Sequence, residues 1–305
     1  MAIKAVLQLA SEVRPGQTNP LDAPHQVKVQ GVHFLKALVV PESPETVEVQ
    51  LFLTGGGDVF TPRDFCVVSI SPSVQWAEHC RGSGFITSGH DADANDVEGS
   101  RELGIAASAR AEWLQEIRDS CPDTFDHDAI YAEMKANGNL YGPMFADIQT
   151  IRLGDRRAVA TVEIPDVNSQ MPGQHTHPHL IHPATLDAIT HALILFGSQS
   201  RKSGSVMSTS ISELTVSPIM PNQPGRLVDV VIESTSTRAT KIVVVSRDNG
   251  EAASEPLLSI SGLDIVAIGE GQRSEDPHSK LKRPLHIEWE QDADFFSAPS
   301  GGLSS

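Results

Sequence analysis

The sequence predicts an α+β protein made of two similar units, each a long helix packed against an antiparallel sheet. The first observation is an amphipathic helical pattern at residues 1–13, which is followed by a series of strand-like segments. The second is an apolar helical pattern at residues 183–196, again followed by strand-like segments. Consecutive strands separated by turn residues are typical of antiparallel pairing. A helix and a set of strands that recur in the same order indicate an internal repeat of one structural unit.

The first unit is expected at residues 1–92. Its helix carries apolar side chains at helical spacing on one face, namely Ala2, Ala5, Val6, Leu9, Ala10 and Val13. Strand-like segments then follow as a meander, with turn residues between them, at residues 32–40, 46–54, 64–71 and 75–86.

The second unit is expected at residues 120–268, after a linker at residues 93–119. Residues 87–104 are rich in Asp, Gly and Ser, which favours a linker, and a mixed helical stretch follows at 105–135. Further strands are predicted around the helix 183–196, at residues 156–164, 205–217, 225–236, 240–248 and 256–268. The polar tail, residues 269–305, is predicted to be mostly linker with one short strand at 285–289.

Composition narrows the function classes. The chain has 305 residues, a net charge of −16 and no cluster of Lys and Arg, which argues against nucleic-acid binding. Its three cysteines are widely spaced and odd in number, so neither a disulfide framework nor a zinc motif is predicted. A reducing, cytoplasmic setting is therefore expected. No apolar run has the length that a membrane span needs.

The segment HPATLDAITHALILFG, residues 182–197, places an acid and an imidazole on one buried helix. Pro183 suits a first helical turn, Asp187 lies about one turn in, and His191 is four residues later on the same face. The helix dipole favours the carboxylate there, whereas burial favours the carboxylic acid, which can donate a proton. Two interpretations stay open at this point. The pair performs chemistry, or Asp187 stabilises the helix start and His191 is a satisfied core residue.

Other motifs favour structural roles. His175, His177 and His179 alternate in HTHPHLIH, but no carboxylate or cysteine at metal spacing accompanies them, so an exposed loop is predicted rather than a metal site. The glycine triplet 55–57 is predicted to be a turn, because no Lys-Ser or Lys-Thr follows it. Cys80 and His79 are adjacent on a strand and so point to opposite faces, which argues against a nucleophile pair.

Four segments resemble one family. HPATLDAITH is similar to a catalytic motif in which His-Pro-x-x-x-Asp is followed by Gln or His four residues later. The other three segments are LYGPMF at residues 140–145, WAEHCRGSG at 76–84 and IEWEQD at 287–292. Together they resemble, in the right order and over nearly the whole chain, the dehydratase domain of polyketide synthases, most closely the fungal highly reducing type.

This resemblance implies a double hot-dog fold that eliminates water from a β-hydroxyacyl thioester on an acyl carrier protein. It implies that Asp187 protonates the departing hydroxyl, that His191 orients Asp187, and that Tyr141 holds the hydroxyl. By position in the motifs, it also implies substrate-binding roles for Gly142, Pro143, His182 and Pro183. No metal or redox cofactor is implied, since the phosphopantetheine arm comes with the carrier. The expected partners are the carrier and other synthase domains.

The family's general base is a histidine in a His-x-x-x-Gly-x-x-x-x-Pro motif before the first helix, and this motif is absent from the sequence. His25, His33 and His79 do not fit it. The first unit is therefore expected to be incomplete, with Val6 and Leu9 exposed and an unpaired sheet edge. The chain alone is then expected to be inactive and to aggregate or form a homodimer. Three hypotheses follow: a dehydratase truncated at its start, a non-catalytic remnant that binds a carrier or synthase, and a stand-alone protein acting on coenzyme A thioesters.

Overall fold

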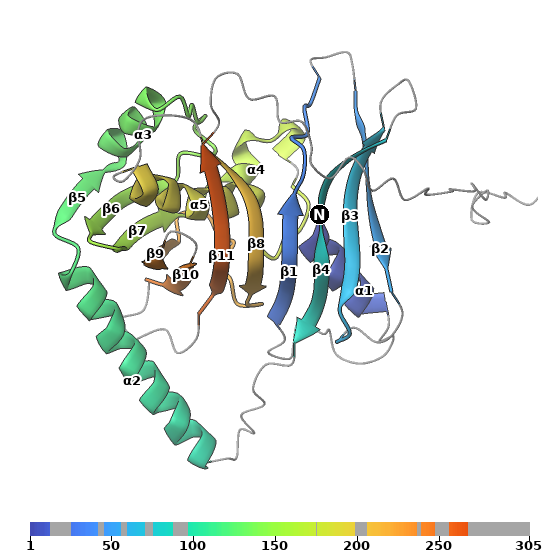
Figure 1. The fold of residues 1–305 in the computed structure, drawn as a ribbon. Coiled ribbons are helices and arrows are strands. Elements are labelled where there is room, and N and C mark those ends of the chain that lie inside the picture. The colour runs from blue at the N-terminus through green and yellow to red at the C-terminus, as the bar shows by residue number, and fades with distance from the viewer. Residues whose placement is uncertain are drawn as a thin grey trace, which may run out of the picture. The chain divides into compact units, whose positions relative to one another are not determined.

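A computed structural model describes residues 1–12, 26–41, 46–55, 60–70, 76–87, 97–174, 176–198, 206–236, 239–247 and 256–267. Its centre is a sheet of eleven strands that pair antiparallel throughout, in the order β2-β3-β4-β1-β8-β11-β10-β9-β7-β6-β5 (Figure 1). Residues Met1–Gly269 form one compact unit. The predicted tail, its strand at 285–289 and the IEWEQD segment lie outside the described residues.

The first half of the sheet carries helix α1 on one face (Figure 1). Its elements are α1 (Ala2–Glu12), β1 (Gln26–Phe34), β2 (Glu48–Thr54), β3 (Arg63–Ile70) and β4 (Trp76–Thr87). Gly84 of β4 lies directly beneath Val6 of α1, and a Cβ atom at Gly84 would stand 2.9 Å from a methyl group of Val6. The glycine therefore allows the helix to approach the sheet closely.

Two expectations for the first half are wrong. Val6 is 4% exposed and Leu9 is half-buried, because α1 packs on β1 and β4 of the same half. The strand expected at 32–40 is β1 at Gln26–Phe34 instead, and the apolar residues after Phe34 are mostly exposed. Alternation decided the position: Val27 and Val29 are buried between half-exposed polar neighbours, whereas residues 35–40, the rest of the apolar run, lie beyond the end of β1.

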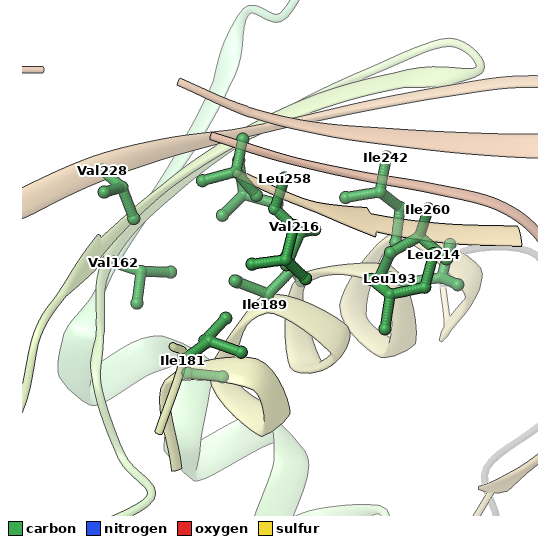
Figure 2. Close-up of a cluster of buried hydrophobic side chains, with 14 of the residues drawn as sticks. Val162, Ile181, Ile189, Leu193, Leu214, Val216, Val228, Ile242, Leu258 and Ile260 are labelled. Carbon is green, nitrogen blue, oxygen red and sulfur yellow. The ribbon is translucent and has the colours of Figure 1, made fainter. Parts of the chain in front are cut away.

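The second half repeats the arrangement around a longer helix, α5. Its elements are α2 (Val97–Asp119), β5 (Asp123–Asp126), α3 (His127–Ala136), β6 (Ile148–Gly154), β7 (Arg157–Glu163), α4 (Val167–Gln170), the short turn η2 (Pro172–Gln174), α5 (Pro183–Ser198), β8 (Val206–Val216), β9 (Leu227–Ser236), β10 (Ala239–Ser246) and β11 (Leu258–Ala267). Ile189 and Leu193 of α5 point into a core formed with Val216, Leu258 and Ile260 of the sheet (Figure 2). No helix in the described ranges has the length and apolar character to cross a membrane.

The halves join where β1 pairs with β8. Val27 lies opposite Val216, and Val29 lies opposite Leu214, and all four side chains are buried. Apolar pairs at this junction make one continuous core under a single sheet. The predicted α+β repeat of a helix against an antiparallel sheet is confirmed, while the unit boundaries 1–92 and 120–268 stay predictions.

The segment expected as a linker, 93–119, is mostly the helix α2. Leu114 and Ile117 near its end pack against Val231 of β9, whereas the neighbouring Val230 and Ile232 belong to the core around α5. Alternate residues of a strand point to opposite faces. Helix α2 therefore covers the face of the sheet opposite α5, and the buried contacts described for it lie near its end.

Candidate active site

The start of α5 is held by His182. Its imidazole Nδ1 accepts a hydrogen bond from the backbone N–H of Ala184 at 3.1 Å, and its carbonyl accepts from the N–H of Leu186 at 3.0 Å. Burial, and then the neighbouring His179, lower the pKa of His182, which keeps the Nδ1 lone pair free to accept. His182 thus acts as a helix cap in the structure, and Pro183 occupies the exposed first turn, as predicted from its fixed φ.

Asp187 and His191 are brought together one turn further along α5. The Nε2 atom of His191 lies 3.0 Å from Oδ2 of Asp187. The imidazole is 0% exposed, whereas the carboxyl side chain is 45% exposed. The Asp187 side chain is therefore only partly buried within the described residues. The neighbouring Ala188 and Ile189 face the core instead.

The surroundings of His191 define which ring nitrogen carries the proton. Its Nδ1 is buried and has no hydrogen-bond partner within the described part of the chain. A buried N–H without an acceptor costs more than a bare nitrogen lone pair in an apolar setting. We therefore assign the neutral tautomer in which Nε2–H donates to Asp187 and Nδ1 is unprotonated. This makes His191 a fixed donor that holds one carboxyl oxygen of Asp187.

Tyr141 completes the cluster from the loop before β6. Its ring centroid lies 3.8 Å from that of His191, with 45° between the planes. Burial, and then the charge of Asp187, raise the pKa of Tyr141 to about 12, so the phenol keeps its proton and remains a donor beside the carboxyl group. Gly142 and Pro143 are exposed in the turn that carries Tyr141, and the Gly142 carbonyl accepts from the N–H of Phe145 at 2.9 Å.

Comparison with known proteins decides the family. A family model described as the polyketide synthase dehydratase N-terminal domain matches residues 109–275, more than half of the chain. The chain belongs to the polyketide synthase dehydratase family. A highly reducing polyketide synthase from Alternaria alternata is 30% identical to this dehydratase over 269 residues, which are 87% of the chain and 9% of the relative. Another from Stachybotrys chartarum is 28% identical over 98% of the chain and 12% of the relative. The dehydratase thus spans about a tenth of these relatives.

Solved structures support the fold of this dehydratase. The dehydratase domain from the CurK module of the curacin polyketide synthase matches with a TM-score of 0.60 and 21% identity, over 80% of this chain and 76% of that one. The dehydratase domain from the CurF module matches with a TM-score of 0.62 and 18% identity, over 85% and 80%. The double hot-dog expectation is confirmed by these neighbours.

The other histidines considered from the sequence lie in structural settings. Both ring nitrogens of His79 have partners in this dehydratase, Nε2 with Oγ of Ser69 at 2.8 Å and Nδ1 with the carbonyl of Lys36 at 3.0 Å. His33 is exposed on β1, next to the buried Val32 and so on the opposite face. His25 and His175 lie outside the described residues. Within the ranges that are described, no three His, Cys, Asp or Glu side chains form a metal-binding cluster.

Sequence reasoning missed two residues beside the site, Tyr131 and Asp147. Asp147 follows the Tyr141 loop, is 7% exposed, and has an Oδ2 atom without a partner among the described residues. Burial, and then the charge of Glu163, raise the pKa of Asp147 to about 7, which the charge of His127 partly opposes. No spacing rule marks a single Asp in a loop, so only the fold reveals that it is buried.

Asp147 is expected to make this dehydratase less stable as the pH rises. The carboxyl pKa is 3.8 without the protein environment and about 7 in the folded chain, so between these values the native state binds more protons than the unfolded state. The free energy of unfolding then falls with pH across this window, by up to roughly 4 kcal/mol at about 1.4 kcal/mol per pKa unit. In Asp147→Asn this fall should largely disappear.

Urea unfolding at about pH 5 and about pH 8 measures the effect. The matched control is Asp155→Asn, because Asp155 is exposed in the β6–β7 turn. It should keep the pH dependence of the parent. An Asp147→Asn variant with the same pH dependence as the parent would contradict the prediction.

Proposed function

We propose that this dehydratase removes water from a β-hydroxyacyl thioester carried on the phosphopantetheine arm of an acyl carrier protein, giving an α,β-enoyl thioester. The observation that carries the proposal is the Asp187–His191 pair at 3.0 Å with the Tyr141 ring against the imidazole. The His191 imidazole and the Tyr141 phenol thus lie beside one partly exposed carboxyl group, that of Asp187. Family membership supports the choice of reaction.

In the proposed mechanism, Asp187 enters as the carboxylic acid. His191 donates its Nε2–H to Oδ2 of Asp187, so the acidic proton is carried on Oδ1, which is free to face the substrate. A general base takes the α-proton, the electrons of that C–H bond form the α,β double bond, and the C–O bond breaks. Oδ1 gives its proton to the departing hydroxyl, which leaves as water. The Tyr141 phenol holds the same hydroxyl by a hydrogen bond.

The base is proposed to be a histidine, by resemblance to the family. Two structures of the CurK dehydratase are described as inactive mutants, one with a histidine replaced by phenylalanine and one with an aspartate replaced by asparagine. This supports a reaction that needs both residue types. His79 and His191 of the described residues are engaged with Ser69 and Asp187, which makes them poor choices for the base. The proposal assigns the acid half of the reaction to Asp187, oriented by His191.

The proposed partners are the acyl carrier protein and other polyketide synthase domains, and the proposed setting is the cytoplasm. The group that must be bound is the acylated phosphopantetheine arm, so no further cofactor is proposed. The described cysteines, Cys66, Cys80 and Cys121, are all free thiols, which agrees with a reducing compartment.

The test is a mass measurement on an intact carrier loaded with a 3-hydroxyacyl group. It is run with the 305-residue chain and with the longest reading frame that contains it. The expected result is loss of one water from the carrier in at least one of these proteins, and gain of one water when the enoyl carrier is the starting material. A folded protein that changes neither mass would overturn the proposal. Carrier binding without turnover would indicate a binding module instead.

A further inference from the structure

Helix α3 makes hydrogen bonds to the end of the loop that carries Tyr141. Asp126 caps the helix by accepting a hydrogen bond from the N–H of Ala129 at 2.9 Å, and Ile130 and Met134 anchor it in the core. His127 and Tyr131 are one turn apart, and their ring centroids are 5.0 Å from each other. The two side chains therefore form one rigid edge beside the loop.

This edge holds the backbone of the loop at three atoms. The His127 imidazole Nε2 lies 3.2 Å from the carbonyl of Ala146. The Tyr131 hydroxyl accepts from the N–H of Ile148 at 3.1 Å and lies 3.5 Å from the carbonyl of Phe145. The tip of the loop has less support, since Gly142 is exposed and a Cβ atom built there meets no atom within 4 Å. The position of Tyr141 thus depends on how the end of the loop is held.

The ring of Tyr131 also contacts the site itself. Its centroid is 6.2 Å from that of Tyr141, with 73° between the planes, and 6.4 Å from that of His191, with 80°. Edge-to-face contacts of this kind favour one relative orientation of the rings. Burial raises the pKa of Tyr131 above the usual range, so its hydroxyl remains protonated and neutral at the site.

We propose that Tyr131 is a positioning residue of this dehydratase, which places the Tyr141 phenol against His191 and Asp187 through both its ring and its hydroxyl. It does not touch the substrate. Tyr131 instead fixes the position of the Tyr141 hydroxyl, which is carried on a loop. Functional groups on loops lose their precise position when the residues that support them are removed. The consequence for the reaction rate rests on the proposed function, whereas the placement of Tyr141 does not.

The test uses the fact that the chain has two tyrosines, Tyr131 and Tyr141. NMR of the full chain with fluorinated or ¹³C-labelled tyrosine gives two signals, and any replacement of Tyr131 removes one and so assigns the other. In the parent, the Tyr141 signal is displaced from its unfolded value by the adjacent His191 ring. In Tyr131→Leu the Tyr141 signal should move most of the way toward its unfolded value. In Tyr131→Phe, which keeps the ring but loses the hydroxyl, the signal should move part of the way.

The control is Leu114→Ala on α2, which lies in a separate buried cluster and should lower the unfolding temperature without moving the Tyr141 signal. A folded Tyr131→Phe chain whose Tyr141 signal matches the parent would overturn the proposal, and this holds even if Tyr131→Leu fails to fold. With a loaded carrier, Tyr131→Phe should lower kcat by roughly tenfold or more, with little change in KM, because misplacing a catalytic group costs rate. If the parent shows no turnover, the NMR result still decides the placement of Tyr141.

Discussion

In a protein that contains this chain together with the family's histidine, replacing Asp187 by asparagine is expected to lower the rate of dehydration by roughly a hundredfold or more. Asparagine has nearly the same shape and keeps an oxygen that can accept from the Nε2–H of His191. It carries no acidic proton, so the departing hydroxyl must leave unprotonated. Because the Asp187 side chain is 45% exposed, the fold does not depend on its charge, and the free energy of unfolding should change by less than about 1 kcal/mol.

The measurement is the initial rate of water loss from a 3-hydroxyacyl carrier, together with the unfolding temperature of the same sample. His191→Gln serves as the matched control, because glutamine offers an amide N–H in place of the imidazole N–H and the family motif accepts Gln or His at this position. It should retain much more activity than Asp187→Asn. A folded Asp187→Asn protein with a rate near that of the parent would remove Asp187 as the acid.

A large loss of stability is expected from replacing Asp229, which lies on the face of the sheet that α2 covers. Its side chain is 2% exposed, and it binds Arg118 of α2 at 2.5 Å and Arg247 after β10 at 3.3 Å. The hydroxyl of Thr161 donates to the same carboxylate at 3.0 Å. Arg247 also contacts the hydroxyl of Thr161. One buried carboxylate therefore joins α2, β7, β9 and the end of β10.

Asp229→Asn is expected to lower the free energy of unfolding by about 3 kcal/mol, since removing one partner of a buried ion pair leaves the other charges uncompensated. The unfolding temperature should fall by roughly 6–12 °C, at about 2–4 °C per kcal/mol. We expect a loss of unfolding free energy near the lower end of the range for broken buried ion pairs. The side chains of Arg118 and Arg247 are partly exposed, so they can turn toward water when the charge of Asp229 is removed.

Glu213→Gln provides the matched control for Asp229→Asn. Glu213 pairs with Lys28 at 2.7 Å in the same sheet, but its side chain is 42% exposed. An exposed pair of this kind is typically worth about 0–1 kcal/mol. Equal losses of unfolding free energy in Asp229→Asn and Glu213→Gln would contradict the prediction. They would show that burial does not determine how much the ion pairs of Asp229 contribute to stability. Thermal unfolding in one buffer compares them directly.

The sequence by itself determined the features that depend on neighbours along the chain. Asp187 and His191 meet because residues four apart share one face of a helix, and this geometry needs no tertiary contact. The start of α5 at Pro183 follows from the fixed φ of proline in the same way. The strands β7 to β11 were readable from apolar runs and turn residues. The error at β1 arose where an apolar run and an alternating pattern disagreed.

Only the tertiary structure decided the rest, because it depends on residues that are distant in sequence. The ring centroids of Tyr141 and His191 are 3.8 Å apart although the residues are fifty positions apart in sequence, because α3 packs on β5 and β6 and holds the end of the Tyr141 loop. The partial burial of Tyr131 and Asp187 and the full burial of Asp147 likewise follow from which elements cover them. Helix α2 carries little apolar pattern of its own and is held to the sheet by Leu114, Ile117 and Arg118. A local pattern specifies the direction of a side chain, but the fold determines what that side chain meets.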